Sequence, residues 1–296
     1  MALAITVNDP AVREDLLDLI VNIDPEEDQL YVGLQKHKAS QPYHQWLTDT
    51  LATVTGAGQN EGFDPAFAAR TNPVRKANYT QIISAEFQIT DSERNSNTAG
   101  FKDRYTYEMQ KALLEWRRNA EFSIVRNSLA SGNTSASAAR QMAGVRAQIT
   151  TLTTNQASVS LSESILNDYF QNAWTNGGIV DNVYVGARLK RRISGFTNTN
   201  TRFVDATTSS VNNVINVYDS DFGRVNIHKH RWVQNSDDTN LNVIGLQQDK
   251  WAVAHLDEPH YQEIPRTGYS SKGMIVGELT LEALNEKSSF QAFNLQ

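Results

Sequence analysis

The longest regular pattern of apolar and polar positions covers residues 105–129 and predicts one long helix ending at Ser131-Gly132. At about 100° per residue, one broad stripe collects Phe101, Tyr105, Met109, Ala112, Leu113, Trp116, Ala120 and Ile124. The opposite face is apolar too, because Tyr107, Leu114, Phe122, Val125 and Leu129 share it with Arg104, Lys111 and Arg118. Such a helix is covered either on both sides by its own chain or on one side by adjacent subunits.

A second pattern alternates strictly over residues 79–90 and predicts a half-buried strand. One face collects Tyr79, Ile83, Ala85, Phe87 and Ile89. Residues 43–56 are also typical of a strand, whereas residues 56–78 contain three glycines and two prolines and show no period. Irregular connections longer than about 12–15 residues are uncommon in compact domains. Residues 41–95 therefore form either a floppy surface loop or an extended hairpin arm lying on a neighbouring subunit.

The remaining segments mix helices and antiparallel strands, which favours an α+β fold. Asp9-Pro10 and Asp24-Pro25 are typical helix starts, and Ser160 with Glu163 has the spacing of a capping box for a helix ending at Gly177-Gly178. The segment 145–154 is a possible strand. A hairpin is predicted around residues 219–223, and further strands follow to the C-terminus.

Composition narrows the function. The 296 residues include no cysteine, which excludes disulfides and thiol nucleophiles, and the net charge of −6 argues against a sequence-specific reader of duplex DNA. No secretory signal or membrane-spanning run is found.

The histidines are the best candidates for chemistry. His228 and His230 lie two apart on a predicted strand and could share a metal ion, but Gln234 stands where a third ligand would be needed. His255 and His260 lack metalloprotease spacing. A metal-dependent hydrolase using these four histidines is the alternative function, but no set of residues resembles an active site. We therefore expect no catalytic residue, no cofactor and no bound metal.

Several segments resemble, in order, the major capsid proteins of tailed bacteriophages with the Hong Kong 97-type fold. One segment resembles the family's N-terminal arm leading into its extended loop: DLLDLIVNIDPEEDQLYVGLQKHKASQPYHQWLTDTL. Another resembles the returning strand of that loop: RTNPVRKANYTQIISAEFQIT. A third segment resembles the family's spine helix: YEMQKALLEWRRNAEFSIVRNSLASG. Two more resemble its later strands: VYDSDFGRVNIHKHR and GELTLEALNE. The family's Thr-Pro-aromatic turn after Pro25 is replaced here by EEDQLYVG.

The resemblance implies five parts: an N-terminal arm (1–40), an extended loop (41–95), a peripheral domain with the spine helix (96–155), an axial domain (156–270) and C-terminal strands returning to the body (271–296). It implies a virion protein that assembles, in the host cytoplasm, into hexamers and pentamers of an icosahedral head. Implied partners are a separate scaffolding protein, a portal, a decoration protein and non-specifically contacted double-stranded DNA, with no membrane. A tail or decoration protein is a further alternative. The candidate subunit-interface residues are Ile83, Phe87, Arg118, Phe122 and Val125.

Overall fold

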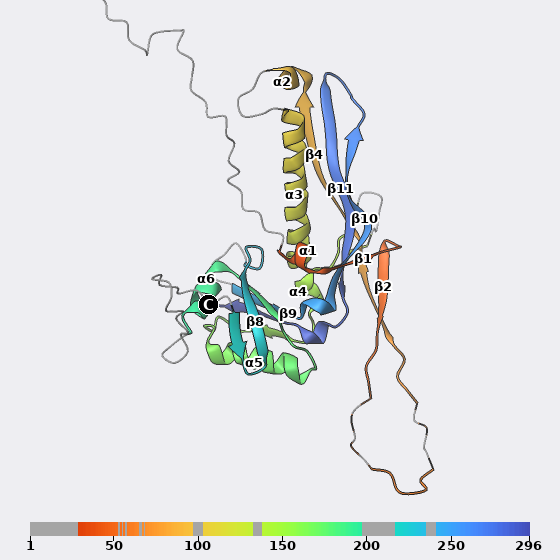
Figure 1. Ribbon diagram of the computed structural model, residues 1–296, viewed down its shortest axis with the longest axis vertical. Helices are drawn as coiled ribbons and strands as arrows, with labels where there is room; N and C mark the ends of the chain where they lie inside the picture. Colours follow the sequence, from red (N-terminus) through yellow and green to blue (C-terminus); the bar gives the residue numbers. More distant parts are fainter. Residues whose placement is uncertain are drawn as a thin grey trace, which may run out of the picture. The chain divides into compact units, whose positions relative to one another are not determined.

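The computed structural model describes residues 29–52, 54, 56, 58–64, 67, 69–96, 103–132, 138–196, 217–234 and 241–296 (Figure 1). The two Asp-Pro helix starts lie outside the described residues, as does Phe101. The chain divides into two compact units. Of the described residues, one unit combines those of 84–116 with 260–276, and the other combines those of 29–83, 117–259 and 277–296.

A four-stranded sheet has the order β1-β10-β11-β4. Its strands are β1 (Gln35–Lys38), β4 (Gln81–Thr90), β10 (Trp251–Ile264) and β11 (Ser270–Ala283), and β1 pairs with β10 in parallel. β4 confirms the predicted alternation, since Ile83, Ala85 and Ile89 are buried and Phe87 is half-buried, whereas Ser84, Glu86 and Gln88 are exposed. β4 is a neighbour of β11, so this strand belongs to the body of the protein and not to a projecting loop, as its place in residues 41–95 had implied.

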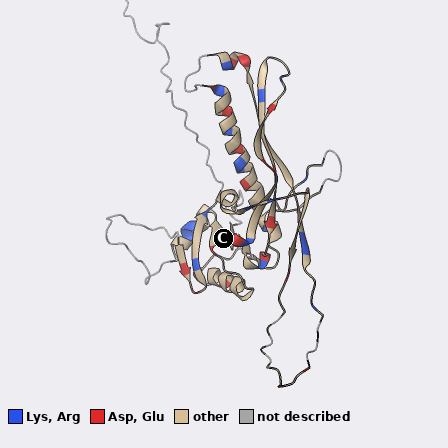
Figure 2. Ribbon diagram, turned by 45° about the vertical axis from the view of Figure 1, so that its right-hand side comes forward, with Lys and Arg blue, Asp and Glu red and all other residues tan. Residues whose placement is uncertain are grey.

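The long helix is confirmed as α3 (Arg104–Arg126), preceded by the short α2 (Asp91–Asn95). In the first unit its N-terminal half runs along β4 and β11 (Figures 1 and 2). Ala112, Trp116, Ala120 and Ile124 of the predicted stripe are buried. Leu113 was expected among them but is 42% exposed, because it lies at the edge of the stripe. The helix ends before Leu129, which is exposed.

The second sheet has six strands in the order β5-β12-β9-β6-β8-β7. They are β5 (Thr153–Asn155), β6 (Asn182–Val185), β7 (Val217–Ser220), β8 (Gly223–Lys229), β9 (Leu241–Leu246) and β12 (Phe290–Leu295). The predicted hairpin is confirmed by the antiparallel β7 and β8, which close at Ser220 and Gly223. Where β9 meets β12, Phe290 pairs with Gly245, and its ring fills the space a Cβ at 245 would need.

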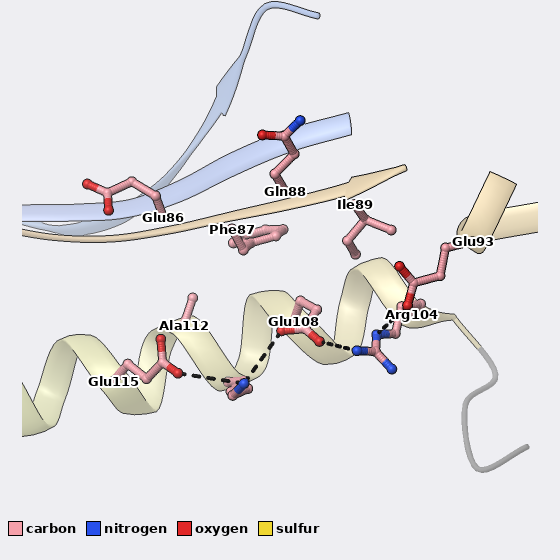
Figure 3. A pocket seen from close by; sticks show the side chains of 10 residues that line it. Glu86, Phe87, Gln88, Ile89, Glu93, Arg104, Glu108, Ala112 and Glu115 are labelled. Carbon is pink, nitrogen blue, oxygen red and sulfur yellow. Dashed lines mark ion pairs between the residues drawn. The ribbon is translucent and has the colours of Figure 1, made fainter. Parts of the chain in front are cut away.

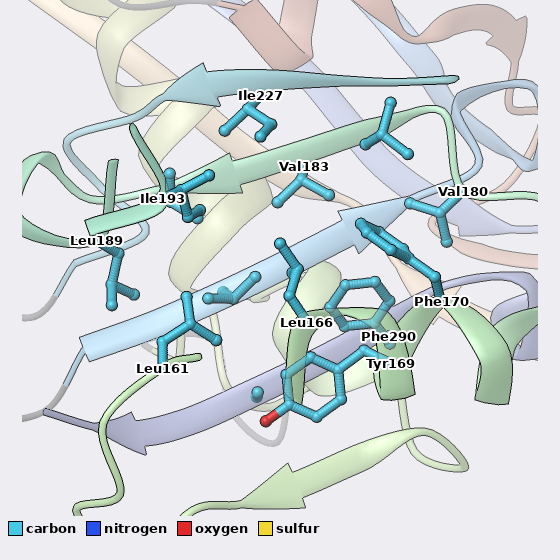
Figure 4. Close-up of a cluster of buried hydrophobic side chains, with 14 of the residues drawn as sticks. Leu161, Leu166, Tyr169, Phe170, Val180, Val183, Leu189, Ile193, Ile227 and Phe290 are labelled. Atoms are coloured by element: carbon cyan, nitrogen blue, oxygen red, sulfur yellow. The ribbon is translucent and has the colours of Figure 1, made fainter. Parts of the chain in front are cut away.

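Two helices supply apolar side chains to this sheet (Figure 4). Helix α5 (Glu163–Thr175) contributes Leu166, Tyr169 and Phe170, and α6 (Ala187–Ser194) contributes Leu189 and Ile193. Ser162, and not the expected Ser160, caps α5 by accepting a hydrogen bond from the Ile165 N–H at 3.3 Å. The strand expected at 145–154 is wrong in its first half, which forms α4 (Val145–Gln148). Short 3₁₀ turns at Gln248–Lys250 and Glu286–Ser288 complete the elements.

A buried carboxylate connects three elements of the second unit. Glu121 of α3 has no exposed side-chain surface, and its oxygens accept hydrogen bonds from the Leu30 N–H (2.8 Å) and the Tyr31 N–H (2.7 Å) of α1 (Gln29–Gly33). His230, just beyond β8, lies with its Nε2 2.7 Å from Glu121 Oε1. A carboxylate is tolerated in a dry interior only when its oxygens are hydrogen-bonded, so these contacts position α1 against α3 and the end of β8.

We expect Glu121→Gln to lower the free energy of unfolding by about 1–3 kcal/mol, because the amide would leave a buried donor unsatisfied. Urea unfolding of the unassembled chain measures this. Glu115→Gln is the control: that side chain is 46% exposed and forms a long ion pair of 3.8 Å with Lys111, so a change within about 0.5 kcal/mol is expected. Equal losses would contradict the role given to Glu121.

Trp116→Ala should lower the free energy of unfolding by about 3–5 kcal/mol, because the fully buried indole would leave a cavity. Leu113→Ala on the same helix should cost less than about 1 kcal/mol, since Leu113 is already largely exposed. A loss at Leu113 matching that at Trp116 in thermal unfolding would contradict the observed orientation of α3.

Candidate subunit-interface surfaces

The five candidate interface residues are in different environments. Ile83 (6% exposed) and Val125 (0%) are buried within the subunit, so neither presents a side chain to a neighbour as the prediction required. Phe87 is half-buried and packs edge-on against Tyr105 of the same unit, with ring centroids 5.1 Å apart. Arg118 is half-buried, and Phe122 is 39% exposed.

Phe122 is the centre of a small aromatic surface on the second half of α3. Trp232 lies edge-on to it with ring centroids 5.4 Å apart, and the Arg126 guanidinium lies 5.5 Å from its centroid. The contact with Trp232 was not predictable from the sequence, because it joins positions more than a hundred residues apart. Aromatic rings beside an arginine are typical of protein–protein contacts, and this group is referred to below as the Phe122 surface.

The first half of α3 carries charged side chains instead (Figure 2). A groove of about 320 Å³ separates them from β4 (Figure 3), and its lining residues are Glu86, Phe87, Gln88, Ile89, Glu93, Arg104, Glu108, Lys111, Ala112 and Glu115. Arg104 pairs with Glu108 (2.9 Å) and with Glu93 (3.6 Å), while Lys111 lies 3.9 Å from Glu108 and 3.8 Å from Glu115. The carboxylates are thus paired with cations of their own unit.

Near this groove a tyrosine pair holds the start of α3. Tyr105 and Tyr261 share a hydrogen bond of 2.6 Å between their hydroxyl oxygens. Burial, followed by this hydrogen bond, raises the pKa of Tyr105 to about 12. Tyr105 is therefore neutral at physiological pH. It connects the start of α3 to Tyr261 through the hydrogen bond and to Phe87 through the ring contact.

The most exposed large apolar side chains of the described residues lie on a loop beyond the two-stranded ribbon of β2 (Tyr43–Thr48) and β3 (Val74–Tyr79). These strands pair antiparallel, from Tyr43 opposite Tyr79 to Thr48 opposite Val74, and no third strand of the described residues joins them. The exposed apolar residues of the ribbon and loop are Leu47 (67%), Leu51 (99%), Val54 (92%), Phe63 (50%), Phe67 (95%) and Val74 (60%). We call this group the loop surface.

The base of the ribbon is held firmly to the body. His44 Nε2 lies 2.6 Å from Glu282 Oε1, and His37 Nδ1 lies 2.7 Å from the other oxygen of the same carboxylate. The Trp46 indole N–H donates to the Ala283 carbonyl at 3.0 Å. The buried Asn78 amide donates to the carbonyls of Ala143 and Leu281. The loop therefore projects from a fixed base.

The histidines proposed as metal ligands make structural hydrogen bonds. His230 bonds Glu121, His228 Nε2 lies 3.0 Å from Asn182 Oδ1, and His255 Nε2 lies 3.1 Å from the Tyr31 hydroxyl. Burial, followed by nearby cationic lysines, lowers the pKa values of His228 and His255. Among the residues that the structure describes, no group of three His, Asp or Glu is placed to bind a metal ion.

Membrane insertion has no support in the helices either. Within the described ranges, none of them combines the length and apolar character needed to cross a bilayer.

A comparison with protein families decides the identity. The family model described as "SU10 major capsid protein" matches residues 4–296. The chain belongs to this family. The capsid protein is thus a component of the virion that associates with itself into a shell, and it is not an enzyme. No relative was found among curated protein sequences.

Solved structures confirm the Hong Kong 97-type α+β fold of the capsid protein. A chain of the Gordonia phage Cozz structure matches with a TM-score of 0.64 at 12% identity, covering 97% of this chain and 92% of that one. The capsid of a native GTA particle matches with a TM-score of 0.69 at 9% identity, covering 100% of both chains. The holo-SrpI encapsulin complex from Synechococcus elongatus PCC 7942 gives 0.63 at 6% identity, covering 100% and 97%.

The ribbon anchor yields a prediction for the capsid protein. We expect His44→Leu to accelerate amide hydrogen exchange in β2 and β3 about 5–10-fold, because one hydrogen bond to the buried Glu282 is lost. His37→Leu is the matched control, since it removes the other imidazole from the same carboxylate but lies on β1. The anchor assignment fails if both variants accelerate exchange in the ribbon equally.

Proposed function

We propose that this capsid protein assembles into hexamers and pentamers that form the icosahedral head enclosing the phage genome. The observation that carries the proposal is the loop surface: several large apolar side chains are exposed on a segment with a rigid base. Burying a Leu or Phe side chain stabilises by about 1.5–3 kcal/mol. Contiguous apolar surface of this kind marks an interaction site in soluble proteins.

The loop surface is suited to a contact with another copy of the chain. A two-stranded ribbon is marginal by itself in water, and within the described part of the chain no third strand pairs with β2–β3. A neighbouring subunit that covers the loop would bury its apolar side chains and stabilise the ribbon at the same time. The extended loop of the proposed organisation accordingly comprises the ribbon and the residues between its strands, without β4.

The Phe122 surface is the second proposed contact, together with Arg118 on the same helix. Phe122 and Leu129 remain exposed although they lie in or just beyond an otherwise apolar part of the chain. Ile83 and Val125 support the subunit core instead. Phe87 stabilises its own unit by packing against Tyr105, and we do not assign it to a subunit contact.

We extend the proposal to the other parts and partners of the head. Residues 1–40 would act as the N-terminal arm, and the six-stranded sheet with α5 and α6 as the axial domain. α3 with the four-stranded sheet would form the peripheral domain, to which the C-terminal strand β11 returns. A separate scaffolding protein, a portal, a decoration protein and non-specific contact with packaged DNA complete the proposed assembly, which would take place in the host cytoplasm.

Assembly is tested by changing the loop surface. We expect the double variant Leu51→Ser, Phe67→Ser to lose shell formation while its free energy of unfolding changes by less than about 0.5 kcal/mol, because both side chains are exposed in the subunit. Light scattering after size-exclusion chromatography measures particle mass, and electron microscopy shows particle shape.

The matched control changes two exposed polar residues of the same loop, Gln59→Ser and Asn60→Ser, and should assemble like the unchanged protein. Normal shells from the double variant would rule out the loop contact. A wild-type chain that stays monomeric at high concentration, with scaffold present, would rule out the proposed assembly itself.

A further inference from the structure

Helix α5 ends in a tightly hydrogen-bonded turn. The Gly177 N–H donates to the Trp174 carbonyl and the Gly178 N–H donates to the Ala173 carbonyl, both at 2.9 Å, which is the Schellman arrangement. Gly177 has a φ of 83°, a left-handed conformation that glycine adopts without strain. Asn176 precedes it as the C-cap, with a φ of −88° and a ψ of 9°. The turn therefore fixes the backbone on both sides of the Asn176–Gly177 peptide bond.

Asn176–Gly177 is the one Asn–Gly pair in the sequence, and such a pair has a chemistry of its own. The backbone nitrogen of Gly177, once it has lost its proton, can attack the side-chain Cγ of Asn176. A bond forms between that nitrogen and Cγ, the Cγ–Nδ2 bond breaks and ammonia leaves, which gives a cyclic succinimide. Water then opens the ring to aspartate or isoaspartate. Glycine has no Cβ to hinder the attack, and both residues are exposed to water.

Three features of the folded turn oppose this reaction. The Gly177 N–H is already engaged with a carbonyl of the helix. The Asn176 Nδ2 group donates to the Asn172 carbonyl at 2.8 Å, which holds the side-chain amide along α5. Ring closure also requires the Gly177 nitrogen to turn toward the Asn176 Cβ, whereas a ψ of 9° places it in line with the backbone nitrogen of Asn176. The turn thus keeps the two reacting atoms apart.

Gly178 holds the turn against the body of its unit. It is buried, and a Cβ at this position would lie 2.3 Å from the Ser288 Cα, so the two backbones are in close contact. The following Ile179 N–H donates to the Gln247 Oε1 at 3.2 Å. Gly177, in contrast, has no atom within 4 Å of the place that a Cβ would take. Opening the turn breaks these few contacts and leaves the six-stranded sheet intact, so it is a local event.

We propose that Asn176 is a site of spontaneous deamidation, which the turn at the end of α5 holds unreactive and which local opening of that turn releases. The product has no N–H group to donate to the Asn172 carbonyl. It also adds a negative charge at a helix C-terminus, where the helix dipole disfavours it. The reaction therefore weakens α5, which supplies Leu166 and Phe170 to the core. Because ammonia is lost, converted chains accumulate with time, and this does not depend on shell formation.

The urea dependence of the reaction tests the proposal on the full, unaltered chain. Peptide mass spectrometry follows the conversion of Asn176 at mildly alkaline pH. We expect the chain in strong urea to react at least about tenfold faster than the folded chain, because the turn is then open throughout. Below the unfolding transition the rate should hardly change with urea, since local opening exposes little surface.

Two outcomes of the urea series would overturn the proposal. Equal rates in the folded and the unfolded chain would show that the turn gives no protection. A steep rise of the rate with urea below the unfolding transition would show that the reaction needs unfolding of the whole unit and not opening of the turn.

A matched pair of glycine substitutions tests the same point from the structure. Gly178→Ala should accelerate the conversion of Asn176 about five- to tenfold, because the added Cβ meets the Ser288 backbone and opens the turn. Gly144→Ala is the control, since its Cβ would lie 2.6 Å from the Ile124 carbonyl oxygen, in the same unit but outside the turn. Circular dichroism establishes that each variant folds.

The proposal is contradicted if both folded variants accelerate the reaction equally, or if folded Gly178→Ala leaves its rate unchanged. If Gly178→Ala does not fold, the urea series on the unaltered chain decides.

Discussion

The hydrogen bonds of one buried carboxylate determine how the second unit is put together. Glu121 stands on the spine helix, accepts from two backbone N–H groups of α1 and contacts the imidazole of His230 beyond β8. Removing a charge from water costs several kcal/mol unless its hydrogen bonds are replaced, so none of these three partners can move away independently.

The apolar residues fall into two sets: those that the subunit covers and those that it leaves exposed. The covered set includes one stripe of α3 and the inward face of β4, which make the subunit stable by itself. The exposed set is concentrated on the loop surface and around Phe122, where anchored elements carry it. In the proposed assembly, folding and association draw on different side chains, which allows a subunit to fold first and to associate afterwards without rearranging its core.

Much of this fold could be predicted from periodicity. The alternation in β4 and the helical pattern of α3 each continue for ten or more residues, long enough for the pattern to be clear. Periodicity gives the direction of a side chain but not what lies there, which is why Ile83 and Val125 were assigned to an interface although the subunit buries them. The partners of Glu121 could not be predicted, because they are about ninety and more than a hundred residues away. Its position inside the apolar run of residues 120–125 was the available signal.

The uneven distribution of charge changes the meaning of the net value of −6. Taken as a property of the whole surface, that value implies mutual repulsion between copies and between the shell and DNA. The net charge of residues 29–296 is only +1, however, and the net charge of the 28 residues before them is −7. Repulsion between the bodies of neighbouring subunits is therefore small, and apolar contacts such as the loop surface can determine the association. The electrostatic response to salt then depends mainly on what the acidic N-terminal segment contacts, since that segment carries the chain's excess of negative charge.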